Sequence, residues 1–257
     1  MTPDPTPARV LQVSVDRGVA RLTLDSPGNR NALSRAMRAQ LRSAIDDALA
    51  DDAVRVLVLD HTGRVFCSGM DLGEAAGNAA EAQGVLEFPD LLTTLWHASK
   101  PVLAVVRGPA RAGGVGLLAA CDVVVAGASA TFAFSEVRLG LVPGVISAVV
   151  LPRMHRQPAH RLMLTGEVFG ADVAMAAGLV DLAVPDEEVD ATVQAQVTAL
   201  VAGAPAALAE TKRLLRSGGL RGSMGELQEL SARYFAGDDG QEGIAAFREK
   251  RPPRWVP

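Results

Sequence analysis

The sequence predicts an α/β fold, on three observations. Two apolar runs without alternating polar residues, 54–61 and 101–106, are typical of parallel strands covered on both faces. Amphipathic segments stand between such runs, and in one of them apolar residues recur every four positions, at Leu33, Met37, Leu41, Ile45 and Leu49. Helical patterns dominate the last third of the chain. Strands alternating with helices and then giving way to helices indicate an α/β core with a helical C-terminal region.

Each predicted element follows from a local pattern in the sequence. Two near-alternating runs within 10–27 flank Asp16-Arg17-Gly18, which predicts a hairpin. A core-facing helix over 31–52, the strand 54–61, an amphipathic helix within 81–98 and the strand 101–106 follow. Two short strands are expected on either side of the turn "AGASA". The later helices are expected at 158–166, 170–178 with Gly178 as its C-cap, 186–202, 205–217, 223–236 and 239–250, with a short return strand over 179–184.

Composition excludes several classes of function. The chain has 257 residues, enough for one large domain or one domain with an appendage. The net charge is only −4 and arginine is dispersed, which argues against nucleic acid as a partner. No apolar run approaches the roughly 18 residues of a membrane span. The start "MTPDPTPARV" has no apolar core typical of a signal peptide, so we expect a cytoplasmic protein.

Cysteine and histidine give little support for a metal site. Cys67 and Cys121 lack metal-ligand spacing and stand beside apolar residues, so we expect buried thiols. The four histidines never occur as H-x-x-x-H or H-E-x-x-H, and we therefore expect no metal. Asp60, Asp122 and Asp172 are interpreted as loop or cap residues.

The glycine-rich stretch "GPARAGGVGLLAACD" (108–122) allows three interpretations. Gly114, Gly116 and Ala119 spell G-x-G-x-x-A, and Glu136 lies 20 residues past Gly116, as a dinucleotide fingerprint requires. Against this, residues 109–112 separate the strand from the glycines, and about a hundred residues of α/β chain precede them. Glycine clusters also serve oxyanion holes and tight packing of a helix on a strand.

Two loops break the strand-to-helix pattern with small residues. "FCSGMDL" leaves backbone exposed around Gly69 and Met70, and "ARAGGVGLL" does the same around Gly113. Two helix N-termini with bare amides, brought together, would stabilise a developing negative charge on one oxygen. The alternative is that each loop is a simple tight turn.

Glu136 is the candidate acid–base residue. It follows an apolar strand amid Phe132, Phe134 and Leu139, and partial desolvation would raise its pKa and suit it to proton transfer. The alternative is an ion pair with Arg138 or another arginine. The nucleophile elbow G-x-S-x-G and the phosphate loop G-x-x-x-x-G-K-[ST] are both absent from the sequence.

Six ordered segments together resemble the crotonase superfamily, also called enoyl-CoA hydratase/isomerase. They are "NRNALS", "FCSGMDL", "RGPARAGGVGLLAACD", "FAFSEVRLGLVPG", "LTGEVFGADVAMAAGLVD" and "EGIAAFREKRPP". The resemblance extends over about residues 10–254. The resemblance implies a ClpP-like spiral of ββα units over 10–200. It also implies a helical trimerisation region over 201–257, assembling as a trimer or a dimer of trimers.

The resemblance also implies the substrate and the residues that bind it. An acyl-CoA thioester would place its carbonyl oxygen against the backbone amides of Met70 and Gly113, with no separate cofactor. Arg30 would suit the phosphates or adenine region of CoA, and the segment Ser68, Gly69, Met70, Asp71 and Leu72 would line the adenine and pantetheine path. Phe247 and Lys250 match C-terminal residues that reach CoA, commonly from a neighbouring subunit.

The catalytic carboxylates depart from the family pattern. Two-carboxylate hydratases keep one glutamate in the glycine segment and one in the "F-x-x-x-E" segment; here the second is Glu136, whereas Gly116 stands at the first position. A hydratase acting on branched or glutaconyl-type 2-enoyl-CoA esters is the favoured interpretation. A single-glutamate Δ3,Δ2-enoyl-CoA isomerase and a non-catalytic acyl-CoA-binding protein remain as alternatives.

Overall fold

The computed structural model describes residues 9–75, 87–217, 228–229, 232–234 and 237–256. Its strands are β1 Leu11–Asp16, β2 Val19–Leu24, β3 Val56–His61, β4 Val102–Val106, β5 Ala110–Arg111, β6 Val123–Gly127, β7 Thr131–Ala133, β8 Phe169–Gly170 and β9 Leu182–Val184. Its helices are α1 Arg35–Ala50, α2 Leu72–Ala75, α3 Phe88–His97, α4 Gly113–Ala120, α5 Gly144–Arg153, α6 Arg156–Thr165, α7 Ala171–Ala176, α8 Val189–Val201, α9 Pro205–Arg216 and α11 Asp238–Glu249. Short 3₁₀ helices cover Pro27–Asn29, Ser135–Leu139 and Asp186–Glu188.

The strands form two sheets. Six strands pair in the order β1-β2-β3-β4-β6-β9, antiparallel between β1 and β2 and parallel elsewhere. The small second sheet has the order β5-β7-β8. The predicted α/β class and the hairpin at Asp16-Arg17-Gly18 are confirmed. The two short strands around "AGASA" exist, but β6 and β7 lie in different sheets, so the turn between them carries the chain from one sheet to the other.

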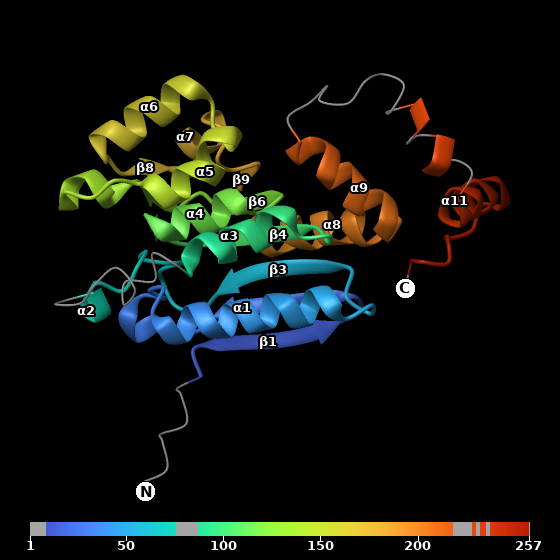
Figure 1. Cartoon of the computed structure of the whole chain (residues 1–257), viewed down its shortest axis with the longest axis horizontal. Helices are drawn as coiled ribbons and strands as arrows, with labels where there is room; N and C mark the ends of the chain where they lie inside the picture. Colours follow the sequence, from blue (N-terminus) through green and yellow to red (C-terminus); the bar gives the residue numbers. More distant parts are fainter. Residues whose placement is uncertain (1–8, 76–86, 218–227, 230–231, 235–236, 257) are drawn as a thin grey trace, which may run out of the picture.

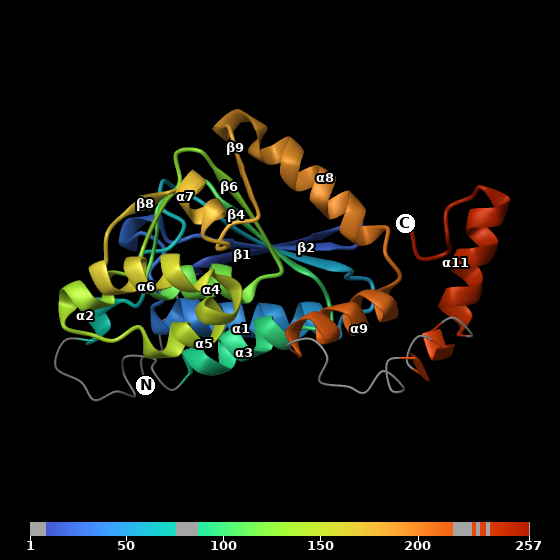
Figure 2. The same cartoon turned by 90° about the horizontal axis from the view of Figure 1, so that it is seen from above.

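Helices cover both faces of the large sheet, as Figure 2 shows with α8 on one side and α1, α3 and α4 on the other. The side chains of β3, β4 and β6 alternate between these layers. One set meets a row of α8 valines spaced four residues apart, and the other belongs to the larger core beneath α1, α3 and α4. Burial on both faces explains why these strands appear in the sequence as continuous apolar runs.

Some boundaries differ from the prediction for local reasons. Helix α1 begins at Arg35, not near residue 31, because Arg30 and Asn31 adopt positive φ angles of 61° and 52°. The Ser34 side chain then caps the helix by accepting a hydrogen bond from the Met37 N–H at 3.2 Å. Helix α5 was not predicted. The predicted helix at 223–236 and the start of the one at 81–98 lie largely outside the described residues.

The C-terminal region is anchored through α9 and the last residues. Lys212 on α9 is buried, and its Nζ donates to Asp122 Oδ2 at 2.7 Å and to the Leu95 carbonyl at 3.2 Å. Arg216 Nη2 donates to Asp122 Oδ1 at 3.0 Å. Asp122 is therefore an ion-pair partner and not merely a cap. Helix α11 stands away from the sheet (Figure 1), and the Trp255 carbonyl accepts a hydrogen bond from Arg55.

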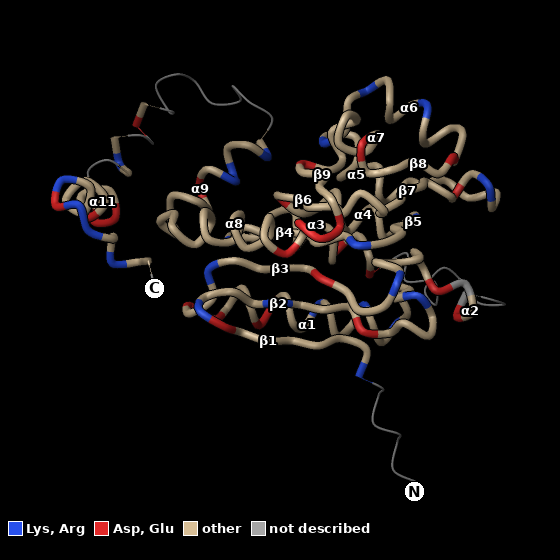
Figure 3. Tube along the Cα trace, turned by 180° about the vertical axis from the view of Figure 1, so that it is seen from behind, with Lys and Arg blue, Asp and Glu red and all other residues tan. Residues whose placement is uncertain are grey.

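Charged residues are dispersed over the chain, with acidic and basic side chains interspersed on α11 (Figure 3). Within the described ranges no single helix is long and apolar enough to cross a membrane. The bent pair 186–201 and 205–216 meets both criteria together. The predicted division at residue 200 falls next to the end of α8 and stays a prediction.

Candidate active site

The segments 29–33 and 67–71 lie side by side and gather the predicted CoA-path residues. The Ser68 N–H donates to the Arg30 carbonyl at 3.1 Å, and the Leu33 N–H donates to the Gly69 carbonyl at 2.8 Å. The Asn29 side chain donates to Asp71 Oδ2 at 3.2 Å. Arg30, Ser68 and Asp71 therefore share one edge of the molecule, and the Arg30 side chain is exposed there. Leu72 begins α2, and its side chain lies outside the described set.

The two loops with small residues meet. The Arg111 N–H donates to the Cys67 carbonyl at 2.9 Å. Gly69 has a φ of +91°, and a Cβ on it would lie 3.1 Å from the Ala112 Cβ and 3.5 Å from the Gly113 nitrogen. Glycine at 69 thus serves both the left-handed backbone and the close approach of the second loop. Met70 and Gly113 consequently belong to adjoining backbone segments.

Both amides proposed for the oxyanion hole are free to bind a ligand. Within the described part of the chain, neither the Met70 N–H nor the Gly113 N–H donates a hydrogen bond. Gly113 is the first residue of α4, so its N–H is one of the donors that the helix leaves open, and the helix dipole adds positive potential. The preceding Ala112 has φ 48° and ψ −117°, a strained conformation that aims the N–H groups of this helix start.

Glu136 lies near this pair of loops. The Ala112 N–H donates to the Ala133 carbonyl at 3.0 Å, and Glu136 follows three residues later in the 3₁₀ helix Ser135–Leu139. Its Oε2 atom is buried without a hydrogen-bond partner. Burial raises the pKa of this carboxyl above its usual value, and a hydrogen bond from its own backbone N–H opposes the rise only in part.

The alternative ion pair of Glu136 with Arg138 does not form. Arg138 Nε instead donates to the Thr165 carbonyl at the end of α6, at 2.7 Å. In the described residues Glu136 also has no salt bridge to another arginine. A desolvated carboxyl without a neutralising partner can exchange a proton near neutral pH, which an ion-paired one does less readily.

Among the described residues, the nearest side chains to Gly116 are apolar. A Cβ at this position would lie 2.5 Å from Ile146 Cγ2 on α5 and 3.7 Å from Leu92 Cδ1 on α3. One turn earlier, a Cβ on Gly113 would lie 2.9 Å from Leu33 Cδ1 and 3.5 Å from the Phe88 ring. The glycines of α4 are therefore also packing residues, as one interpretation of the sequence held.

Sequence reasoning did not identify this apolar wall. Phe88 and Leu92 are four residues apart on α3, and they meet two glycines three residues apart on α4. The spacing of these residues is visible in the sequence, because helix positions i and i+4, and i and i+3, lie on the same face. Ile146 had no comparable signal, since α5 itself was not predicted.

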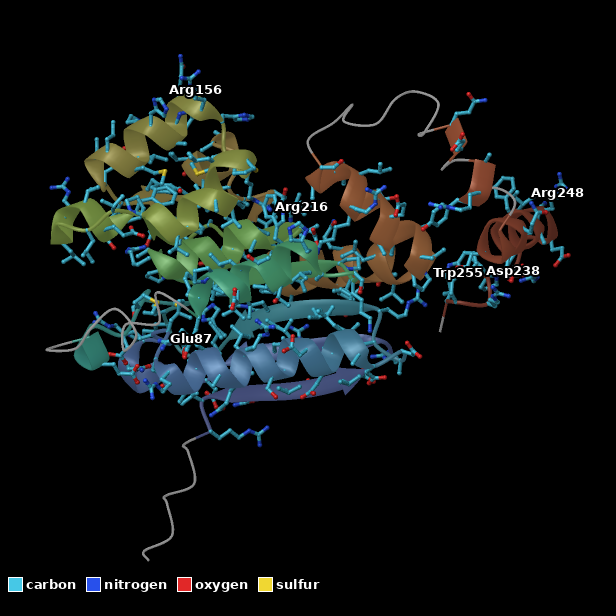
Figure 4. All side chains as sticks on the ribbon, viewed as in Figure 1. Glu87, Arg156, Arg216, Asp238, Arg248 and Trp255 are labelled. Atoms are coloured by element: carbon cyan, nitrogen blue, oxygen red, sulfur yellow. The ribbon has the colours of Figure 1, made fainter. Side chains whose placement is uncertain are left out.

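Phe247 and Lys250 are not brought to these loops by their own chain. Phe247 is 85% exposed on α11, and Lys250 is the C-cap of that helix. Figure 4 shows Arg248, next to Phe247, at the opposite end of the molecule from Glu87, which precedes α3. Any contact of these two residues with CoA would have to come from another copy of the chain.

Cys67 and Cys121 are buried thiols, as predicted, and burial raises the pKa of each to about 12. Cys67 therefore contributes its backbone to the site and no nucleophile. Across the described residues no group of three or more histidine, cysteine, aspartate or glutamate side chains could hold a metal ion.

The comparisons with known proteins agree with this arrangement. The family model described as enoyl-CoA hydratase/isomerase matches residues 14–256. The chain therefore belongs to the enoyl-CoA hydratase/isomerase family, within the crotonase superfamily. It is 37% identical to a probable enoyl-CoA hydratase of Rhodobacter capsulatus, over 96% of this chain and 97% of that protein.

Two further relatives cover almost the whole chain. A 2,3-dehydroadipyl-CoA hydratase of Escherichia coli is 34% identical, over 95% of this chain and 97% of its own. The crystal structure of a putative enoyl-CoA hydratase/isomerase from Legionella pneumophila superposes with a TM-score of 0.89 at 33% identity, covering 96% of this chain and 98% of that one. The predicted crotonase fold is thereby confirmed, and the family implies an acyl-CoA thioester as substrate.

Proposed function

We propose that this protein is an enoyl-CoA hydratase that adds water to a 2-enoyl-CoA thioester with Glu136 as its single acid–base residue. The observation that carries the proposal is the half-buried Glu136 carboxyl, whose Oε2 atom is buried without a hydrogen-bond partner, near the loops that hold two free backbone amides. The relatives named as hydratases support it. Addition of water consumes only the ester and water, so no cofactor is required.

The proposed mechanism follows from this arrangement. The thioester oxygen accepts hydrogen bonds from the Met70 and Gly113 N–H groups, which strengthen as negative charge develops there. Ionised Glu136 takes a proton from water while the water oxygen bonds to Cβ, and the electron pair of the double bond moves toward the thioester as an enolate. The protonated Glu136 then returns the proton to Cα, which restores the carboxylate and completes the 3-hydroxyacyl-CoA.

The apolar side chains of Phe88, Leu92 and Ile146 support a proposal for the acyl group near the thioester. Phe88, Leu92 and Ile146 cover the glycine face of α4, so we expect the acyl chain to bind an apolar surface near Cα and Cβ. Branched or glutaconyl-type esters are the proposed substrates. The relative that is a 2,3-dehydroadipyl-CoA hydratase supports an acyl chain with a distal carboxylate.

We also propose that a second copy completes the CoA site, in a trimer or a dimer of trimers. The separation of α11 from the loops of its own chain supports this assembly. Phe247, 85% exposed, would then cover CoA bound to a neighbour.

A Δ3,Δ2-enoyl-CoA isomerase is the second candidate, favoured by one observation. Ile146 and Leu92 fill the space beside Gly116 where a second carboxylate would help to hold water. Isomerisation needs one base and no water, because the proton leaves one carbon of the acyl chain and returns to another.

One experiment separates these activities. The protein is incubated with a 2-enoyl-CoA and, separately, with a 3-enoyl-CoA, and the absorbance of the conjugated thioester is followed. Loss of absorbance from the 2-enoyl ester supports hydration, and a gain from the 3-enoyl ester supports isomerisation. No change in either, with acyl-CoA still bound, supports the non-catalytic interpretation and refutes both enzymes. Glu136→Gln is the matched variant, and full activity in it would refute the assignment of the base.

A further inference from the structure

Arg38 on α1 is a buried cation that takes no part in the proposed reaction steps. Only 3% of the residue is exposed, and its Nη2 atom is buried without a hydrogen-bond partner. Arginine is seldom buried, since leaving water costs a charged group several kcal/mol unless its donors are paired. A buried guanidinium with an open donor therefore calls for a functional explanation.

The partners of Arg38 lead to the oxyanion hole. Its Nη1 donates to the Leu33 carbonyl at 2.6 Å. The N–H of the same leucine donates to the Gly69 carbonyl at 2.8 Å, and the peptide that contains this carbonyl also contains the Met70 N–H. The Leu33 side chain lies against Gly113, 2.9 Å from where its Cβ would be. Arg38 thus holds Leu33, a residue that contacts both the Gly69–Met70 peptide and Gly113.

The charge of Arg38 is poorly neutralised. Its ion-pair partner is Glu87, with Nε and Oε2 3.3 Å apart, and 58% of the Glu87 side chain is exposed. Figure 4 shows Glu87 beside α1. Water screens this carboxylate far better than it screens the buried guanidinium. Among the described residues, the guanidinium charge of Arg38 is therefore only partly offset, and this charge lies on the Leu33 side of the Met70 peptide.

We propose that Arg38 is a positioning residue for the enolate: it holds Leu33, and through it the Met70 peptide, and its charge favours the anionic form of the bound ester. This proposal rests on the proposed function, because it assumes that an acyl-CoA enolate forms here. It assigns Arg38 no contact with the substrate. A purely structural role would lower stability without changing the balance between neutral and enolate forms.

The test uses a 3-oxoacyl-CoA such as acetoacetyl-CoA, whose enolate absorbs in the near ultraviolet. Its apparent pKa when bound is measured by pH titration of that absorbance in the wild type, Arg38→Met, Arg38→Gln and Arg38→Lys. We expect Met and Gln to raise the apparent pKa of the bound ester, and Lys to restore most of the wild-type value because it keeps the charge. For the hydration reaction, kcat of Arg38→Met and Arg38→Gln should fall roughly 10-fold, with KM nearly unchanged. Removal of a direct oxyanion-hole donor typically lowers kcat by about 100-fold or more.

Arg153→Met is the matched control. Only 9% of the Arg153 side chain is exposed, and it donates to the backbone carbonyls of Cys121 at 2.6 Å and Leu179 at 2.9 Å. Within the described residues, none of its hydrogen bonds reaches segments 67–71 or 111–113. An unchanged enolate pKa in Arg38→Met or Arg38→Gln would overturn the inference, as would an equal rise in Arg153→Met. Wild-type protein that binds the ester without favouring its enolate would instead refute the proposed function.

Discussion

The contact between Gly116 and Ile146 gives the sharpest stability prediction. Replacing Gly116 with Ala adds a Cβ 2.5 Å from Ile146 Cγ2, at least about 1 Å inside the optimal separation of carbon atoms. Ile146 is 3% exposed and cannot swing into water. Overpacking of this kind costs about 1–3 kcal/mol, and the better helix propensity of alanine returns about 0.5–1 kcal/mol. We expect Gly116→Ala to lower the free energy of unfolding by about 1 kcal/mol.

The side chain at position 146 should determine how much Gly116→Ala destabilises the protein. Ile146→Val keeps the Cγ2 methyl group that clashes, so the cost of Gly116→Ala should persist in it. Ile146→Ala removes Cγ2 and leaves a cavity, which alone costs about 2–5 kcal/mol. In Ile146→Ala the nearest contact of the added methyl group becomes the Cβ of residue 146 at 3.1 Å, so Gly116→Ala should cost much less there.

The assay is equilibrium unfolding in urea at one fixed protein concentration, with the midpoint compared at constant slope. The double-mutant cycle with Ala at 146 should show a coupling of about 1–3 kcal/mol, and the cycle with Val almost none. Equal effects of Gly116→Ala in all three backgrounds would refute the packing argument. The same reasoning predicts that Gly116→Glu alone will not create a working second carboxylate.

Three further predictions concern titrating groups. Glu136→Gln should lower hydration on the order of 100-fold or more. It should also stabilise the protein at neutral pH. Burial raises the pKa of the Glu136 carboxyl in the folded protein, so ionisation of this group opposes folding once the pH exceeds about 4.5, the pKa in the unfolded chain. Thermal melts of the wild type and Glu136→Gln at pH 4 and pH 7 would show the gain at pH 7 only. Burial lowers the pKa of His61, so the wild type should lose stability as the pH falls below about 6.5, the pKa in the unfolded chain. Acid unfolding curves should show a smaller loss in His61→Asn. Cys67 and Cys121, with pKa values raised to about 12, should resist alkylation in native protein and react after unfolding; rapid native labelling followed by mass spectrometry would contradict their burial.

Patterns that depend on neighbouring residues were predictable from the sequence. The hairpin depends on alternation about a turn, α1 on a four-residue apolar repeat, and the parallel strands on continuous apolar runs. The two small-residue loops were also recognisable, because glycine is needed at 69 where two backbone segments approach closely and at 113 where the Leu33 and Phe88 side chains pack against the helix. The structure brings these loops together, and their role in catalysis stays a prediction.

Features that depend on distant residues were not predictable. Asp122 was interpreted as a loop or cap residue, but it pairs with Lys212 and Arg216, which lie 90 and 94 positions later. Helix α5 was missed because it begins at a glycine without a capping side chain and contains Pro152, signals that usually mark a loop. Arg38 fell within the predicted helix, yet its burial depends on the carbonyl of Leu33 and on Glu87 at the start of α3.

The fit between Gly116 and Ile146 also limits how this sequence can change over generations. A larger residue at 116 meets an obstacle while isoleucine remains, and a smaller residue at 146 leaves a void while glycine remains. Each substitution alone, at 116 or at 146, gives a less stable protein, whereas a matched pair of substitutions need not lower stability. If Gly116 stands at the position of the first carboxylate, as the resemblance implies, then packing against Ile146 opposes a glutamate there, and a route to a two-carboxylate hydratase would have to change both positions.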